Sequence, residues 1–271
     1  MNTSKICRTG SSKQTLNYLN LQNGVHIAYR KILGDPDKPY LVFLHEGLGC
    51  IQMWKHFPQQ LCASTGCPGI VYERQGYGHS SPLSEKRNLD YHKNYADYEL
   101  LEVISSLIQG APYFIIGHSD GGTIGLVHAS GQPTNLLGLI TEAAHVFVEV
   151  GTIEGIKKVK EDYAKDLRER LRKYHGDKTD QMFYAWSETW LSGEFLHWDI
   201  QHLLPRVVCP LYAIQGRQDQ FGTEKQIFSI VEQVSGPVKY GFIDDCAHSP
   251  HHEQQELVLE KMEQFINSII K

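Results

Sequence analysis

A buried strand that leads directly into a glycine-flanked serine is the most constraining feature of this sequence. The apolar residues 113–116 predict a strand, residues 117–121 spell Gly-His-Ser-Asp-Gly, and residues 123–129 predict a helix. At such a strand-to-helix turn the serine is lifted clear of the sheet in a strained backbone conformation, and a side chain at either glycine would collide with neighbouring backbone. The helix N-terminus also favours developing negative charge. This context predicts Ser119 as a nucleophile; the alternative is a serine that only caps a buried helix.

The rest of the chain alternates between short apolar runs and segments with helical spacing. This alternation predicts an α/β fold with a parallel sheet, whose ligand site lies at the carboxyl ends of the strands. Asn23-Gly24 predicts a hairpin between the first two strands, and the polar residues 1–13 predict a loose tail. Further strands are predicted at 16–21, 25–32, 40–44, 69–72, 136–143, 211–215 and 238–243, and helices at 53–64, 91–109, 223–234 and 253–270.

Residues 149–204 interrupt this alternation with helical segments alone. Such an insertion is expected to lie over the strand ends as a lid, so we divide the chain into a core of residues 1–148 and 205–271 and a helical cap of residues 149–204. Three of the four tryptophans lie in the insertion. Most of its aromatic side chains are expected to pack against the core, and Trp186 is the candidate for lining an apolar substrate pocket. Within the insertion, helices are predicted at 151–174, 181–191 and 195–204.

Two downstream loops offer the groups that could activate Ser119. A serine hydroxyl is a weak nucleophile until a base removes its proton, and that base must itself be oriented by a third group. Asp219 follows the predicted strand 211–215, and His248 follows the predicted strand 238–243, so the chain order is serine, acid, histidine. We therefore predict Ser119, Asp219 and His248 as a catalytic triad. The alternative is that Asp219 and His248 are surface loop residues.

Other titratable residues near His248 are weaker candidates. Asp244 and Asp245 belong to the same loop and are expected to be solvated turn residues. His251 and His252 begin the last helix and are expected to face solvent or to cap that helix.

A tetrahedral intermediate on Ser119 would need N–H donors for its oxyanion. We predict the backbone N–H groups of Asp120 and Gly47 as these donors, with Leu48 as the alternative to Gly47. A carboxylate aimed at the oxyanion would weaken the site. The side chains of Asp120 and Glu46 are therefore expected to face away from the substrate, held by backbone N–H groups or arginines.

His145 and Arg74 also lie at the ends of predicted strands. We favour a structural role for both, and retain His145, together with Trp186, as the substrate-binding candidates.

Composition limits the partners and the compartment. The formal net charge is −5 and the basic residues are dispersed, which argues against a nucleic-acid partner. The chain has neither a run long enough to span a bilayer nor the apolar core of a signal peptide, so no membrane partner is expected.

The six cysteines form no Cys-x-x-Cys pair, which predicts reduced thiols and a cytoplasmic location. The fourteen histidines are scattered without a His-Glu-x-x-His motif, so no metal site is expected. The expected partner is a small-molecule substrate, and a homodimer is left open.

Taken in order, these motifs resemble the α/β-hydrolase superfamily from residue 15 onward. The resemblance implies a mostly parallel eight-stranded sheet flanked by helices, a helical cap after the sixth strand, and hydrolysis of an ester or a related bond without a cofactor. The chain departs from the usual family pattern at Glu46, where glycine is common, and at Asp120, where a neutral residue is common. The motifs that resemble the family are residues 44–49 with Trp54, 72–80, 117–122, 216–219 and 247–250.

The function expected from these residues is serine hydrolysis of carboxylic esters with small or medium acyl groups. Because the nucleophile is serine and not aspartate, dehalogenase and epoxide hydrolase chemistry is not expected. Two alternatives are kept. One is an amide, lactone or carbon–carbon bond hydrolase with the same fold and site, and the other is a ligand-binding receptor that uses the pocket without fast turnover.

Overall fold

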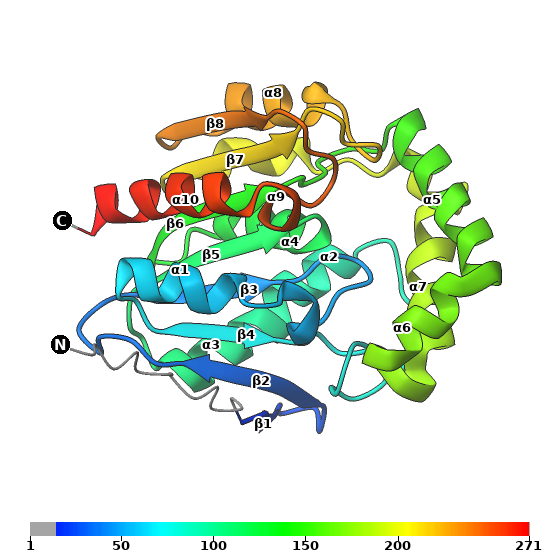
Figure 1. Cartoon of the computed structure of the whole chain (residues 1–271), viewed down its shortest axis with the longest axis horizontal. Helices are drawn as coiled ribbons and strands as arrows, with labels where there is room; N and C mark the ends of the chain where they lie inside the picture. Colours follow the sequence, from blue (N-terminus) through cyan, green and yellow to red (C-terminus); the bar gives the residue numbers. More distant parts are fainter. Residues whose placement is uncertain (1–14, 271) are drawn as a thin grey trace, which may run out of the picture.

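The computed structural model describes residues 15–270, which form one eight-stranded sheet with helices on both faces (Figure 1). Pairs β1–β2 and β2–β4 are antiparallel, and the other five pairs are parallel. The predicted α/β fold with a mostly parallel sheet is therefore confirmed, whereas the predicted tail at 1–13 lies outside the described residues. In sheet order the strands are β1 (Asn17–Asn20), β2 (His26–Ile32), β4 (Gly69–Tyr72), β3 (Tyr40–Leu44), β5 (Tyr113–His118), β6 (Leu136–Glu142), β7 (Leu211–Gly216) and β8 (Val238–Ile243).

The helices follow the predicted positions with local breaks. A 3₁₀ turn and α1 replace the single helix predicted at 53–64, because Lys55 has a positive φ of 52°. The last predicted helix is divided at Gln254, whose backbone is not helical. The helices that flank the sheet are α1 (Phe57–Thr65), α2 (Tyr91–Asn94), α3 (Leu100–Ile108), α4 (Asp120–Ser130), α8 (Glu224–Gln233), α9 (Pro250–Glu253) and α10 (Gln255–Ile269), with 3₁₀ turn η1 (Ile51–Trp54) and π-helical turn η2 (Tyr95–Glu99).

The central strands are apolar on both faces of the sheet. Side chains alternate between faces along a strand, so Phe114 and Ile116 of β5 pack in the core that contains residues of α1 and α10. Ile115, between them, packs in the larger core that contains residues of α3 and α4. Burial on both sides explains why a continuous apolar run, and not an alternating one, marks these strands in the sequence.

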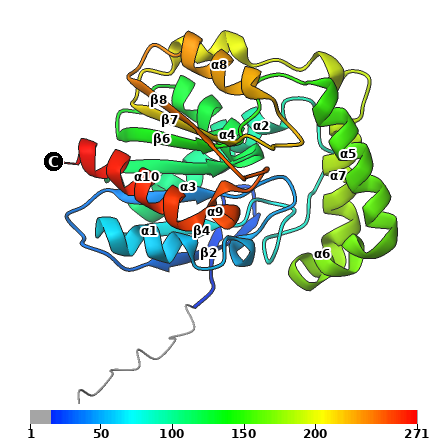
Figure 2. The same cartoon turned by 45° about the horizontal axis from the view of Figure 1, so that its top comes forward.

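Three helices between β6 and β7 form a layer beyond the carboxyl ends of the strands, to the right of the sheet in Figure 1 and, in another orientation, in Figure 2. We call α5 (Val150–Asp162), α6 (Arg168–His175) and α7 (Thr179–Trp190) the cap helices. A π-helical turn, Tyr163–Leu167, joins α5 to α6. The helices lie after the sixth strand, where the resemblance implies a cap; the division into core and cap domains stays a prediction.

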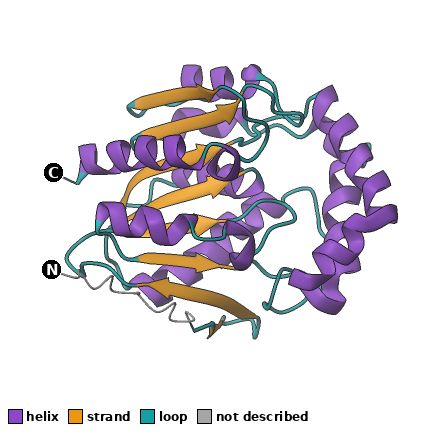
Figure 3. Cartoon of the chain, in the orientation of Figure 1, coloured by secondary structure: helices purple, strands orange, loops and turns teal. Residues whose placement is uncertain are grey.

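The helix predicted at 195–204 is wrong. This segment forms two 3₁₀ turns, Phe195–His197 and Gln201–Arg206, with a loop between them. The cap helices α5, α6 and α7 do form, and Figure 3 shows them as helices beyond the strand ends. Trp198 adopts an extended backbone conformation, and Asp199 forms an antiparallel β-bridge with Phe147. Because Asp199 pairs with Phe147, the backbone between the two 3₁₀ turns cannot continue as a helix.

Two further findings concern the described residues as a whole. Between residues 15 and 270, no helix combines the length and the apolar character needed to cross a bilayer. The five cysteines of this range are free thiols: Cys50, Cys62, Cys67, Cys209 and Cys246.

Candidate active site

Ser119 lies at the sharp turn between β5 and α4. Its φ is +53°, in the left-handed region that L-residues rarely occupy. A Cβ added to Gly117 would lie 2.3 Å from the carbonyl oxygen of Gly121, and one added to Gly121 would lie 2.0 Å from that of Leu44. Any side chain at either position would displace backbone, so the strained, glycine-dependent turn predicted from the sequence is present.

His248 lies between the two groups with which it was predicted to act. Its Nε2 is 3.0 Å from Ser119 Oγ, and its Nδ1 is 2.9 and 3.0 Å from the two carboxylate oxygens of Asp219. A carboxylate only accepts hydrogen bonds, so Nδ1 carries the proton and Nε2 is free to accept one from the serine hydroxyl. The structure thus brings together the three residues predicted from the sequence.

Asp219 is held as a buried carboxylate. Its side chain is 1% exposed, and Oδ1 also accepts a hydrogen bond of 2.9 Å from the backbone N–H of Phe221. Burial alone would raise the pKa of Asp219, but the adjacent His248 and these hydrogen bonds outweigh burial and lower the pKa. The group is therefore an anion able to orient an imidazole and to stabilise its protonated form.

The loops that contain Asp219 and His248 lie side by side because β7 and β8 are parallel neighbours. The backbone N–H of Gln218 donates to the carbonyl of Cys246, and the N–H of Cys246 donates to the Gln218 side chain. Gly216 allows this close approach, since a Cβ there would lie 2.0 Å from the carbonyl oxygen of Ala247. Asp244, in the same loop, is exposed and pairs with Arg217, as expected of a turn residue.

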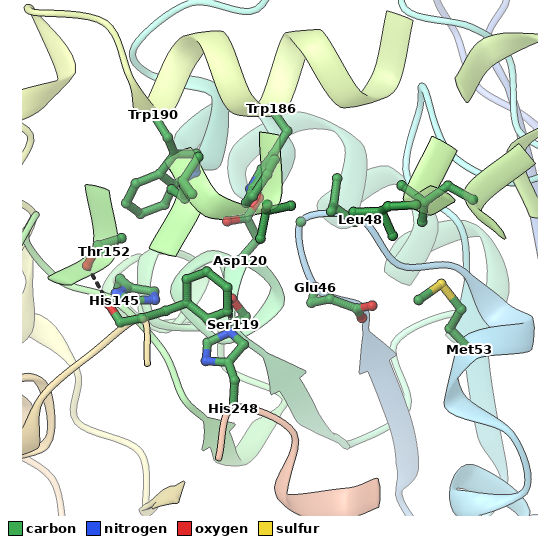
Figure 4. A pocket seen from close by; sticks show the side chains of 16 residues that line it. Glu46, Leu48, Met53, Ser119, Asp120, His145, Thr152, Trp186, Trp190 and His248 are labelled. Carbon is green, nitrogen blue, oxygen red and sulfur yellow. Dashed lines mark hydrogen bonds between the residues drawn. The ribbon is translucent and has the colours of Figure 1, made fainter. Parts of the chain in front are cut away.

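A cavity of about 210 Å³ opens above Ser119 (Figure 4). Its walls are largely aliphatic and aromatic, and the core contributes Leu48, Met53 and Phe221. The cap helices and the turn between α5 and α6 contribute Ile156, Val159, Leu167, Leu171, Trp186 and Trp190.

Both substrate-binding candidates line this cavity. Trp186 descends from α7 toward the Gly47 loop, and His145 lies close to His248 (Figure 4). Burial, and secondarily the neighbouring His248, lower the pKa of His145 to about 4, so its imidazole is neutral near pH 7. His145 Nδ1 is buried and has no hydrogen-bond partner among residues 15–270.

The loop that contains Gly47 is fixed from below by Arg74. The buried Arg74 guanidinium donates to the carbonyl of His45 and, at 2.9 Å, to that of Glu46. The Tyr77 hydroxyl donates to the carbonyl of Gly47 at 3.0 Å. Gly47 itself lines the cavity, whereas Arg74 does not, which agrees with the structural role favoured for Arg74.

The partners expected for Asp120 are wrong, whereas Glu46 accepts a hydrogen bond from its own backbone N–H, as expected, and also pairs with a histidine. Asp120 accepts hydrogen bonds from the Tyr91 hydroxyl at 3.0 Å and from His92 Nε2 at 3.4 Å, not from arginine or backbone donors. Glu46 forms an ion pair of 3.6 Å with His118 Nδ1. The carboxylates meet side chains of α2 and the histidine that precedes Ser119, because the fold brings these segments together. Asp120 and Glu46 are both among the residues that line the cavity, and their carboxylates are bound to side chains that do not line it.

The environment keeps these carboxylates ionised. Burial alone would raise the pKa of Asp120 and of Glu46, but the histidine that faces each one outweighs burial and lowers its pKa. Conversely, burial alone would lower the pKa of His118, but Glu46 outweighs burial and raises it.

The expectation that His251 faces solvent or caps the last helix is also wrong. His251 is buried, with Nδ1 2.6 Å from Glu142 Oε2 and its ring against Trp54 and Phe57. The reason is that Pro250 starts the short helix α9, which turns the following side chain toward the sheet.

Sequence reasoning missed several residues around the site. Tyr91 and His92 reach Asp120, Trp190 Nε1 donates to the Tyr91 hydroxyl at 2.8 Å, and His118 contacts the His248 loop. Of these residues, only His118 could have been found from the sequence, because it belongs to the Gly-His-Ser-Asp-Gly motif of residues 117–121.

The chain is similar to known hydrolases over most of its length. A family model described as "Alpha/beta hydrolase family" matches residues 41–261. Human "Serine hydrolase BPHL" is 26% identical over 159 residues, covering 55% of this chain and 53% of the relative. "Proline iminopeptidase" of Thermoplasma volcanium is 28% identical over 189 residues, covering 69% of this chain and 59% of the relative. "2-succinyl-6-hydroxy-2,4-cyclohexadiene-1-carboxylate synthase" of Photorhabdus laumondii is 33% identical over 117 residues, covering 43% and 39%. The chain thus spans only about half the length of the curated relatives it matches.

Solved structures show the same fold. VinJ superposes with a TM-score of 0.72 at 22% identity, covering 94% of this chain and 99% of that protein. A thermophilic esterase from Thermogutta terrifontis superposes with a TM-score of 0.74 at 17% identity, covering 95% and 100%. At these identities the likeness concerns the fold alone.

Proposed function

Because the chain belongs to the alpha/beta hydrolase family, we propose that it is a serine hydrolase that cleaves carboxylic esters with small or medium apolar acyl groups. The observation that supports this proposal best is the alignment of Ser119 Oγ, His248 and Asp219 at hydrogen-bonding distances of 2.9 to 3.0 Å. Such a constellation activates a hydroxyl that is otherwise a weak nucleophile.

In the proposed reaction, Ser119 Oγ attacks the ester carbonyl carbon while His248 Nε2 takes the hydroxyl proton. His248 then donates this proton to the leaving alkoxide, and an acyl-enzyme remains. A water molecule, deprotonated by His248, releases the acid and restores Ser119. Asp219 keeps the proton on Nδ1 and stabilises the imidazolium in both half-reactions.

The oxyanion is proposed to bind between the backbone N–H groups of Asp120 and Gly47. The N–H of Asp120 is the first of α4 and has no intrahelical acceptor. The hydrogen bond from Tyr77 to the Gly47 carbonyl supports a fixed orientation of the other peptide group. Fixed donors of this kind stabilise the charge that develops in the transition state.

The substrate class is inferred from the cavity walls. Aliphatic and aromatic side chains dominate them, and no Lys or Arg is found among the described residues that line the cavity. An acyl group with a free carboxylate would therefore lose its hydration without gaining a cationic partner. This favours a neutral acyl group over the acidic compounds named for the synthase relatives.

A second candidate is hydrolysis of an ester or amide whose acyl group bears an ammonium. Asp120 and Glu46 belong to the residues that line the cavity, and their negative charges would attract a cation. One relative is named as an iminopeptidase. The carboxylates are already paired with histidine and tyrosine side chains, which is why we place this candidate second.

A p-nitrophenyl ester series from acetate to decanoate tests the proposal. We expect turnover of the short and medium esters, and a loss of about 10⁴-fold or more in kcat for Ser119→Ala. Ser130→Ala is the matched control, since Ser130 is a buried serine at the other end of α4. A fluorophosphonate should label Ser119 only. Equal rates for wild type and Ser119→Ala, or label on another residue, would contradict the proposal.

The same assay separates the alternatives. Faster cleavage of alanyl or prolyl esters and anilides than of butyrate would favour the second candidate. Turnover of lactones or of vinylogous diketones alone would favour the other bond types, and a protein without label or turnover would fit the receptor alternative.

A further inference from the structure

His118 occupies a position from which one side chain can reach three loops of the proposed site. It directly precedes Ser119 in the chain, at the end of β5. Its side chain is only 3% exposed and lies under the His248 loop, with the two imidazole centroids 5.2 Å apart. It is not among the residues that line the cavity, so it has no direct route to a substrate.

One ring nitrogen of His118 holds the backbone of His248. His118 Nε2 lies 2.7 Å from the carbonyl oxygen of His248, 130 residues away in the chain. A carbonyl oxygen can only accept, so Nε2 must be the protonated donor. This bond joins the residue before the nucleophile to the backbone of the proposed base.

The other ring nitrogen faces the loop of the proposed oxyanion donor. His118 Nδ1 lies 3.6 Å from Glu46 Oε2, and Glu46 directly precedes Gly47. Both ring nitrogens thus face acceptors, an arrangement suited to an imidazolium, and the raised pKa of His118 agrees with it. The other titratable groups near this ring are His248 and His252, together with Glu142 and His251, which are paired with each other at 2.6 Å.

We propose that His118 is a positioning residue that holds the His248 loop in register with Ser119, and that Glu46 orients the His118 ring for this task. The proposal rests on the proposed serine hydrolase function. Its physical basis is that a reacting pair displaced by about 1 Å can lose about 100-fold in rate. The Ser119–His248 contact of 3.0 Å depends on two loops that share no covalent link near the site.

Two amide substitutions at His118 separate this role from simple packing. The terminal nitrogen of His118→Gln can reach the place of Nε2, whereas that of His118→Asn reaches only the place of Nδ1. We expect His118→Gln to keep kcat within about threefold of wild type, and His118→Asn to lower kcat by about 10- to 100-fold with KM nearly unchanged. The control is His128→Gln, another buried histidine at the far end of α4, whose Nε2 is hydrogen-bonded to the Tyr113 hydroxyl.

Hydrogen exchange supplies a readout that does not need turnover. The backbone N–H groups of Cys246, Ala247 and Ser249 are hydrogen-bonded to side chains of neighbouring segments. His118→Asn loses the hydrogen bond to the His248 carbonyl, so the exchange rate of these amides should rise by about tenfold. In His118→Gln, which can keep this bond, the rate should not rise. Glu46→Gln should raise it by about threefold, because the ring loses its second restraint.

The outcomes separate the proposal from the function. If His118→Asn matches wild type in kcat and exchange, or if His128→Gln loses as much kcat, the positioning role is overturned while ester hydrolysis stands. If Glu46→Gln leaves exchange unchanged, the part assigned to Glu46 is overturned. A wild-type protein that neither cleaves esters nor takes the fluorophosphonate label would reject the proposed function, and the exchange comparison would still decide whether His118 holds the loop.

Discussion

His251 and Glu142 form a buried pair that joins the start of α9 to the end of β6, with Nδ1 2.6 Å from Oε2. Both side chains are at most 3% exposed. The His248 loop ends where α9 begins, so this pair holds the C-terminal side of that loop against the sheet. His118 contacts the same loop at its middle, through the His248 carbonyl.

We expect His251→Leu to destabilise the fold by about 3 to 5 kcal/mol, because it leaves the buried Glu142 carboxylate without its partner. The double variant His251→Leu/Glu142→Leu should lose less, since no uncompensated buried charge remains. Urea unfolding measures both, and the partly exposed neighbour His252→Leu is the control. If the double variant lost as much stability as His251→Leu and Glu142→Leu together, the two residues would not act as a pair.

The protein is expected to lose stability in mild acid. Burial lowers the pKa of His128, His145 and His175 to about 4, so these groups are neutral in the folded protein at pH 5 but protonated when unfolded. Unfolding then takes up protons, and stability falls as the pH drops from about 6.5 toward 4. Glu99 opposes this, because burial raises its pKa to about 7 and thereby favours the folded state at low pH.

The pKa is also lowered for His45, His92 and His252 and raised for Glu73 and His118. The histidines with a lowered pKa outnumber the groups with a raised one, so the free energy of unfolding should fall by at least about 1 kcal/mol per pH unit between pH 6 and pH 5. Urea titrations at several pH values measure this slope. In His128→Gln the free energy of unfolding should depend less steeply on pH, because one of these histidines is missing. A wild-type free energy of unfolding that does not change between pH 6 and pH 5 would contradict the assignment of neutral buried histidines.

Gly47→Ala should impair the proposed site without unfolding the protein. A Cβ at this position would lie 2.4 Å from Trp186 Nε1, so the indole must move and the cavity wall with it. We expect kcat/KM to fall by about 10- to 100-fold. Adding Trp186→Ala, which removes the clash, should recover part of that loss. Gly151→Ala is the matched control, because a Cβ there meets no atom of the described part of the chain within 4 Å.

Arg74→Lys should loosen the loop that contains Gly47. The planar guanidinium donates to two successive carbonyls, of His45 and Glu46, and a lysine ammonium cannot reproduce that fork. We expect about 1 to 3 kcal/mol lower stability from the unsatisfied carbonyls, together with a lower kcat. Thermal unfolding and ester assays measure the two effects, with the exposed Arg206→Lys as control. Full activity would show that the loop does not depend on this fork.

The strands and the order of the site residues were accessible from the sequence because their causes are local. The runs at 40–44 and 69–72 match β3 and β4 residue for residue, since a strand buried on both faces needs an uninterrupted apolar segment. The turn at Ser119 is likewise encoded by two glycines that no larger residue could replace. Helix ends were less predictable, because tertiary contacts set the break at Gln254 and the turns at 195–206.

The partners of the buried polar groups had no such local cause. Glu142 and His251 are 109 residues apart, and Tyr91 reaches Asp120 across 29. The residues next to a histidine in the sequence do not tell whether its side chain will meet water or a carboxylate. The outcome depends on which segments the sheet order brings together, and on the free-energy penalty for a buried charge without a partner. Local steric rules thus placed Ser119, Asp219 and His248 at strand ends, and packing between distant segments selected the side chains that hold them there.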